Sequence, residues 1–325
     1  MTLFLMPGER LVVLAEQQWS RRVAHGRCVN WTRGRRCEQT QLTGMADEGA
    51  AGGATRASGG TADVVLEVCP QECLHDVRTD IRVSGLTPNT SCTFRMDTHN
   101  DQGRKFSSHA HYVSDDHGRV DVATSEAVGG SYTGVFPVGL FLTLRENPDE
   151  RHRMFKDDPT TPWQMKLAVF EGHLTLEESE AGEASVASTM LYRHLMRPGM
   201  RRIPVRQGRI LGVLYMPQGD GPFPGLVDIF GVKTLREYRA GSYVVLRECR
   251  AGSYVVLREY RAAMLASRGF ASFALCLYNC EDLPKEPEVY ELEYFEEAVE
   301  FLLSQPEVIP DRCGIVSSSK GRSLA

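Results

Sequence analysis

The pattern of apolar residues changes once along the chain, near residue 205, and this change constrains the fold most. Between Ala62 and Pro204, short alternating apolar and polar stretches are separated by turn clusters such as Thr87-Pro88-Asn89. Short strands at such spacing are typical of a β-sandwich. After Pro204, apolar strand-like runs alternate with helical patterns, which indicates a parallel sheet covered by helices. We therefore expect two domains, over 62–204 and 205–325.

The second part contains six expected elements. They are strands over 209–216, 225–230, 270–278 and 314–316, a helix near 262–268 and an amphipathic helix over 289–304. In the last helix, Leu292, Phe295 and Val299 recur at spacings of three to four residues and glutamates occupy the opposite face. The strand over 225–230 is apolar except for Asp228.

The first 61 residues differ in composition from the rest. A stretch with many arginines is followed by a run of Gly, Ala and Ser from Gly49 to Gly60. Such a segment buries too little apolar surface to offset its chain entropy. We expect residues 1–61 to form a disordered extension. We interpret its basic stretch as part of that extension rather than as a targeting signal or a nucleic-acid-binding arm.

The overall composition excludes several classes of protein. The net charge of −5 gives no bulk attraction for nucleic acid, and no apolar run reaches the length of about 18 residues that a membrane helix needs. The nine cysteines are scattered, and the Cys69 and Cys73 pair has no second pair to complete a metal site. We expect no metal, no cofactor, reduced thiols and a cytoplasmic location. The sequence does not indicate an oligomeric state.

An 11-residue segment occurs twice in succession and then begins a third time. The copies that start at Leu235 and Leu246 differ only in having Tyr238 in one and Cys249 in the other. An 11-residue period can sustain a long helix, but the repeated Gly-Ser-Tyr-Val-Val is a poor helix sequence. We interpret the copies as a tandem duplication that inserts residues 239–260, not as a binding element.

The chemistry-bearing motif follows the last strand. The apolar run over 314–316 leads into Ser317-x-Ser319-x-Gly321, which resembles the G-x-S-x-G nucleophile elbow of α/β-hydrolases. We expect Ser319 to be the nucleophile and the backbone N–H of Lys320 to be an oxyanion donor. An alternative is that the three serines form a polar helix cap.

The base that would activate Ser319 is not apparent. A serine nucleophile needs a base within hydrogen-bond reach, and no histidine follows His194. Lys320 could act as the base, as in Ser–Lys enzymes, but we expect its side chain to begin a helix and point away. The sequence thus offers a nucleophile without its usual partner.

Five segments carry a resemblance to a known family. They are Gly129–Leu140, Gly221–Gly231, Tyr260–Phe270, Tyr278–Pro284 and Leu292–Ala298. In these segments the chain resembles the acyl-coenzyme A thioesterase and bile acid-CoA:amino acid N-acyltransferase family. The resemblance implies an immunoglobulin-like β-sandwich followed by an α/β-hydrolase domain. It also implies acyl-CoA as substrate, with the acyl-enzyme resolved by water or by glycine or taurine. A serine at position 319 matches the thioesterases, since the bile acid enzyme has cysteine there.

The chain also departs from the family pattern. Val232-Lys233-Thr234 stands where the family has a glycine-rich loop, and the acid and histidine of the triad are absent. We therefore expect an incomplete α/β-hydrolase domain with the elbow strand at the edge of its sheet. Three functions follow as expectations: an acyl-CoA thioesterase that is inactive in this form, an acyl-CoA:amino acid N-acyltransferase, or a non-catalytic remnant. The compartment of an active relative could also be the peroxisome or the mitochondrion.

Overall fold

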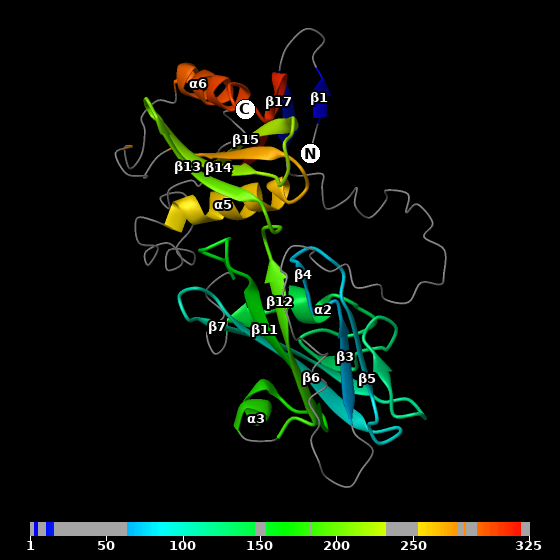
Figure 1. Ribbon diagram of the computed structural model, residues 1–325. Coiled ribbons are helices and arrows are strands. Elements are labelled where there is room, and N and C mark those ends of the chain that lie inside the picture. Colours follow the sequence, from blue (N-terminus) through cyan, green and yellow to red (C-terminus); the bar gives the residue numbers. More distant parts are fainter. Residues whose placement is uncertain are drawn as a thin grey trace. The chain divides into compact units, whose positions relative to one another are not determined.

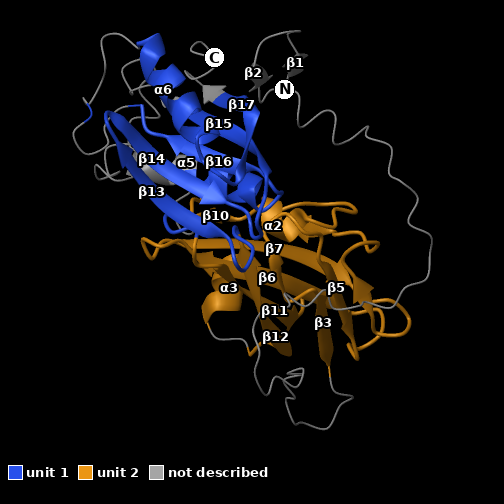
Figure 2. Cartoon of the chain, turned by 45° about the horizontal axis from the view of Figure 1, so that its top comes forward, with its two compact units in different colours: residues 1–36, 157–159, 195–325 blue, residues 37–156, 160–194 orange. Residues whose placement is uncertain are grey.

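The computed structural model describes residues 3–5, 11–15, 64–146, 154–181, 184–231, 253–277, 283 and 291–319. The chain divides into two compact units (Figure 2). Unit 1 comprises residues 1–36, 157–159 and 195–325, and unit 2 comprises residues 37–156 and 160–194. The predicted boundary at 204/205 falls inside a strand of unit 1.

Unit 1 is built on one seven-stranded sheet with the order β1-β2-β17-β15-β16-β14-β13. Its strands are β1 (Leu3–Leu5), β2 (Leu11–Ala15), β13 (Arg201–Gln207), β14 (Ile210–Met216), β15 (Phe223–Gly231), β16 (Ala271–Leu275) and β17 (Val308–Ser319). β16, β15, β17 and β2 are parallel neighbours, whereas β13 and β14 form an antiparallel hairpin on one side. The central parallel strands confirm the predicted strand-and-helix alternation.

Two helices cover opposite faces of this sheet (Figure 1). Alternate residues of β14 show this, because Val213 packs in a cluster with α5 (Ser253–Ala266) while Leu214 packs in a cluster with α6 (Leu292–Leu303). α5 packs against the sheet through small side chains such as Ala263, and α6 through larger ones such as Phe301. The sheet is therefore buried on both faces, as parallel sheets generally are.

The predicted edge position of β17 is wrong. β2 pairs with β17 in parallel from Cys313 to Ser317, and β1 then pairs with β2. The backbone groups of β17 on the side away from β15 are thus hydrogen-bonded along this stretch. β1 and β2 belong to the extension over 1–61 for which we predicted disorder. The other residues of this extension lie outside the described residues.

Unit 2 contains two sheets around one core. The larger sheet has the order β10-β7-β6-β11-β12-β4, with β9 paired to β7, and the smaller has the order β3-β5-β8. The strands are β3 (Val65–Cys69), β4 (Glu72–Leu74), β5 (Asp80–Ser84), β6 (Ser91–His99), β7 (Lys105–Val113), β8 (Val120–Asp121), β9 (Gly129–Gly130), β10 (Arg145–Glu146), β11 (Trp163–Glu171) and β12 (Ala187–His194). Two short helices, α2 (Gly139–Leu142) and α3 (Leu176–Ala181), complete the unit.

The core of unit 2 joins side chains of both sheets. Ile81 and Val83 of the smaller sheet share a buried cluster with Phe94, Tyr112 and Trp163 of the larger one. The hydroxyl of Tyr112 is hydrogen-bonded to that of Tyr132 at 2.7 Å, so this aromatic polar group is buried with a partner. Unit 2 consists mostly of sheet, which confirms that this part of the chain forms a series of short strands.

One helix and the cysteines differ from expectation. α5 begins at Ser253, well before the helix predicted near 262–268, and its first turn is the Ser-Tyr-Val-Val sequence that we predicted to be a poor helix former. Cys69 and Cys276 each take part in a disulfide bond, which contradicts the expectation of reduced thiols throughout. No helix in the described part of the chain is long and apolar enough to span a bilayer.

Candidate functional site

The candidate site lies at the carboxyl ends of β15 and β17. These strands are adjacent and parallel, and Gly231 at the end of β15 is paired with Ser319 at the end of β17. β15 connects through α5 to β16 on one side, and β16 returns through α6 to β17 on the other. In open α/β sheets, ligands bind in the crevice outside the carboxyl ends of the parallel strands.

A buried ion pair holds β15 near this crevice. Asp228 lies three residues before Gly231 and is completely buried, and Arg261 of α5 bonds both of its carboxylate oxygens, with Nε donating to Oδ2 at 2.8 Å. A bidentate contact of this kind fixes both distance and orientation. Asp228 was the one charged residue in the apolar run over 225–230. A lone charge in such a run is a signal for a buried partner, but the sequence could not name Arg261.

A second charged contact lies on the same face of the sheet. Glu259 of α5 accepts hydrogen bonds from Arg202 at 2.6 and 2.9 Å and from the hydroxyl of Tyr215. The hydrogen bond to Glu259 raises the pKa of Arg202, and burial raises the pKa of Tyr215. Glu259 and Arg261 both come from the third, partial copy of the repeat, so part of the sequence that we interpreted as a tandem duplication connects α5 to the sheet.

Ser317 occupies the first position of the elbow motif. It is a regular strand residue of β17, paired with Ile229 on one side and Ala15 on the other. Its side chain is 1% exposed, and its hydroxyl has no hydrogen-bond partner in the described part of the structure. A buried hydroxyl without a partner costs free energy, so this position is not optimised for stability.

The sequence-predicted site residues are only partly described. Ser319 is the last described residue of β17, and its neighbour across the sheet is Gly231, the end of the Asp228-Ile229-Phe230-Gly231 motif. Lys320, the predicted oxyanion donor, lies outside the described residues, as does the Val232-Lys233-Thr234 loop. Their roles stay predictions.

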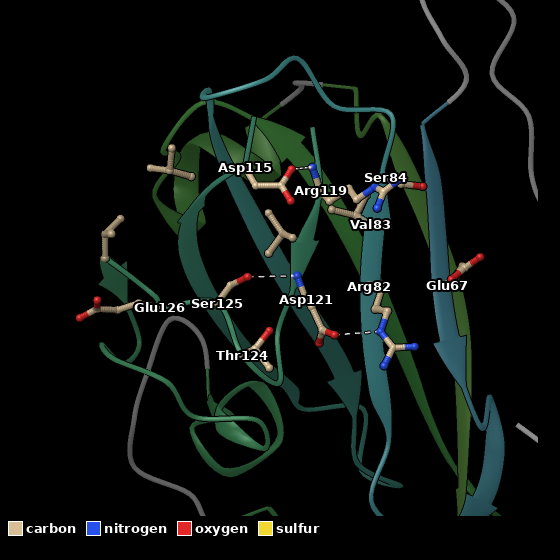
Figure 3. Close-up of a pocket in the computed structure, with 13 residues that line it drawn as sticks. Glu67, Arg82, Val83, Ser84, Asp115, Arg119, Asp121, Thr124, Ser125 and Glu126 are labelled. Atoms are coloured by element: carbon tan, nitrogen blue, oxygen red, sulfur yellow. Dashed lines mark hydrogen bonds and ion pairs between the residues drawn. The ribbon is translucent and has the colours of Figure 1, made fainter. Parts of the chain in front are cut away.

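A cavity in the described part of the structure lies elsewhere, in unit 2 (Figure 3). It has a volume of about 690 Å³. Its polar groups bond one another, since Arg82 donates to Asp121 at 2.9 Å, Ser125 accepts from the backbone of Asp121, and Asp115 accepts from the backbone of Arg119. Because these groups satisfy each other, the cavity presents few of them to a ligand.

The described residues contain no cluster of three or more His, Cys, Asp or Glu side chains that could hold a metal ion. Cys73, Cys92 and Cys313 are free and buried. Burial raises the pKa of the Cys313 thiol on β17 to about 11, so this thiol is protonated at neutral pH and is a poor nucleophile.

Comparison with known proteins shows which family the chain belongs to. Residues 76–207 match the acyl-CoA thioester hydrolase/BAAT N-terminal region, and residues 290–325 match the BAAT/acyl-CoA thioester hydrolase C-terminal region. The chain belongs to this family. The resemblance stated from the sequence is thereby confirmed, and the second matched region contains Ser319.

Individual relatives include both activities of the family. The chain is 40% identical to acyl-coenzyme A thioesterase 3 of Mus musculus over 254 residues, which are 78% of this chain and 52% of the mouse protein. It is 39% identical to the peroxisomal succinyl-coenzyme A thioesterase of Mus musculus over 251 residues, 77% of this chain and 53% of that protein. It is 37% identical to the bile acid-CoA:amino acid N-acyltransferase of Homo sapiens over 259 residues, 79% of this chain and 56% of that protein. The chain thus spans about half the length of these curated relatives.

Proposed function

We propose that this chain carries the nucleophile of an acyl-CoA thioesterase, with Ser319 as the attacking residue. The hydroxyl oxygen of Ser319 attacks the thioester carbonyl, the carbon–sulfur bond breaks, and CoA leaves as its thiol with the proton that a base takes from the serine. Water then hydrolyses the acyl-serine ester to release the fatty acid and regenerate the hydroxyl. The backbone N–H of Lys320 stabilises the oxyanion that forms in both steps.

The pairing of Gly231 with Ser319 carries this proposal. It places the serine at the carboxyl ends of two parallel strands, beside the end of the Asp-x-Phe-Gly motif. The names of the two thioesterase relatives support hydrolysis as the reaction. For the fold, we propose an immunoglobulin-like sandwich over 62–204 and an α/β-hydrolase-type domain over 205–325, preceded by an extension over 1–61.

Two alternatives are retained. The human N-acyltransferase relative supports transfer of the acyl group to the amine of glycine or taurine instead of water. A non-catalytic protein is the third candidate, because unit 1 has no histidine between residue 195 and Ser319 to serve as base. We also propose a cytoplasmic location, with the peroxisome and the mitochondrion as alternatives that the names of relatives support.

One experiment separates these candidates. The full chain, Ser319→Ala and the matched control Ser318→Ala are incubated with a long-chain acyl-CoA, and thiol release is measured after circular dichroism has shown that all three are folded. Hydrolysis predicts release by the wild type and Ser318→Ala, and none above background by Ser319→Ala. Glycine or taurine is then added, and a conjugate detected by mass spectrometry would favour the acyltransferase. No release by any of the three would favour the non-catalytic protein.

A further inference from the structure

Three histidine rings lie in a row on the larger sheet of unit 2. His109 and His111 come from β7, and His173 belongs to residues 172–181, a segment that ends in α3 and that we term the strap. The rings of His111 and His173 are stacked, with centroids 4.8 Å apart and planes within 8°, and the ring of His109 is 5.2 Å from that of His111. Two titratable rings thus form part of the contact between the strap and the sheet.

Each ring of the stacked pair also donates a hydrogen bond. Nε2 of His111 donates to the carbonyl oxygen of Leu174 at 2.8 Å, and Nε2 of His173 donates to the carbonyl oxygen of Tyr112 at 3.1 Å. Because a carbonyl oxygen only accepts, Nε2 carries the hydrogen in both rings and Nδ1 is the site that a further proton would occupy. The arrangement is complete with both rings neutral, and protonation of both would place like charges face to face.

Other contacts hold the strap next to the rings. Arg95 on β6 is paired in register with His109, and its guanidinium donates to the carbonyl oxygen of Leu176 at 3.0 Å and to the hydroxyl of Ser179 at 2.9 Å. Lys105 forms an ion pair with Glu180 of the strap. The charged groups on this side of the sheet are Arg95 and Asp97 on β6, Lys105 on β7, Arg145 on β10 and Lys166 on β11, and those on the strap are Glu177, Glu178 and Glu180.

We propose that His109, His111 and His173 form a pH-sensitive latch, which holds the strap against the sheet when the rings are neutral and releases it when they are protonated. Arg95 is the register partner of His109 on the neighbouring strand, and its positive charge opposes protonation of that ring. Glu177 acts in the opposite sense at His109, but more weakly.

The direction of titration agrees with the latch. Burial, His111 and Arg95 lower the pKa of His109 from its ordinary value of 6.5, and Glu177 raises it by less. A histidine with a lowered pKa in the closed state stabilises that state above about pH 6.5, and this stabilisation is lost as the pH falls below that value. The hydrogen bond from Lys105 lowers the pKa of Glu180, so the ion pair between them persists at the same pH and cannot be the cause of release.

Amide hydrogen exchange of the full chain tests the latch. Protection factors, from which the intrinsic pH dependence has been removed, are measured for peptides of the strap and of β11 at pH 7.5 and 5.5. We expect the protection of strap amides such as Leu174 and Ser179 to fall at pH 5.5 by up to about tenfold, the limit for one proton that only the released state takes up over one pH unit. Protection within β11 should not change.

Three variants separate the latch from a general effect of acid. His173→Phe keeps a stacked ring without a titratable nitrogen, and His111→Gln keeps a neutral donor toward Leu174. Both should reduce the pH dependence of the strap. His117→Gln is the matched control, since His117 lies in an exposed turn, and it should behave as wild type. Equal strap protection at both pH values in the wild type, or an undiminished fall in His173→Phe, would overturn the proposal.

Discussion

Gly231 and Ser319 are paired across adjacent parallel strands, at the carboxyl end of each. This relationship depends on the position of β15, because Gly231 follows the buried Asp228 by three residues. Asp228 in turn is held by Arg261 of α5. The site is therefore connected through β15 to a helix that begins inside the repeated sequence.

The ion pair between Asp228 and Arg261 makes a testable contribution to stability. Replacing Arg261 by Met leaves the fully buried Asp228 carboxylate without its bidentate partner. We expect the free energy of unfolding to fall by about 3–5 kcal/mol, measured by urea denaturation of the full chain. Arg312→Met is the control, since Arg312 is largely exposed in its pair with Asp311, and it should change stability by less than about 1 kcal/mol. Similar small changes in both variants would contradict the expected role of Asp228.

The repeat predicts an unusual tolerance to deletion. Removing residues 239–260 joins Tyr238 to Arg261 and places Glu237 at the position now held by Glu259. The helix would then offer the same Glu-Tyr-Arg sequence to Arg202, Tyr215 and Asp228. We expect the deletion variant to unfold at the wild-type midpoint within a few degrees, as measured by calorimetry.

A deletion of different length is the control for this prediction. Removing residues 243–260 instead replaces Glu259 and Tyr260 with Gly241 and Ser242, so Arg202 and Tyr215 lose their carboxylate partner. Loss of a buried charged contact costs on the order of several kcal/mol, and this variant should unfold at a clearly lower temperature. Equal midpoints for the two deletions would show that Glu259 does not anchor α5.

The helices show how far sequence patterns reach. α6 was predicted from its apolar stripe, and Phe295, Ala298, Phe301 and Leu302 are its buried residues. Leu292, which was included in the predicted stripe, is 66% exposed. α5 was predicted too short because intrinsic propensity disfavours Ser253–Val256, and tertiary contacts of the next two turns override that preference.

The site was predictable only where local sequence determines it. Ser319 follows an apolar strand in a recognisable motif, so it could be named in advance. Its pairing with Gly231 could not be derived, because strand order within a parallel sheet depends on contacts between residues far apart in the sequence. The same limit explains why β2 was not foreseen beside β17. Its sequence Leu-Val-Val-Leu-Ala suits a strand, but nothing local indicates that it pairs with β17.

We expect the substitution Ser317→Ala to stabilise the protein. The buried hydroxyl of Ser317 has no partner in the described part of the structure, so Ser317→Ala removes a desolvated polar group without breaking a hydrogen bond. We expect the free energy of unfolding to rise, by up to about 1–2 kcal/mol. Ser267→Ala is the matched control in unit 1, because the Ser267 hydroxyl donates to the carbonyl oxygen of Leu195 at 2.6 Å, and it should lower stability by about 1 kcal/mol. A loss of stability in both variants would mean that Ser317 has a partner.

The buried thiol of Cys313 should make the protein less stable at alkaline pH. Burial raises its pKa from 9.0 to about 11, so the unfolded chain releases this proton at a lower pH than the folded chain. Above about pH 9 the folded state still holds the proton that the unfolded state has lost. The free energy of unfolding therefore falls as the pH rises, until the pH passes about 11.

The expected size of this effect is on the order of 1 kcal/mol between pH 8 and pH 10. Urea unfolding of the wild type and Cys313→Ala in reducing buffer at both pH values isolates it. At pH 8 the variant should be less stable, because alanine leaves a small cavity in β17. At pH 10 the difference between the two proteins should be smaller, because only the wild type loses the thiol contribution. A difference that does not change with pH would show that the Cys313 thiol titrates alike in the folded and unfolded states.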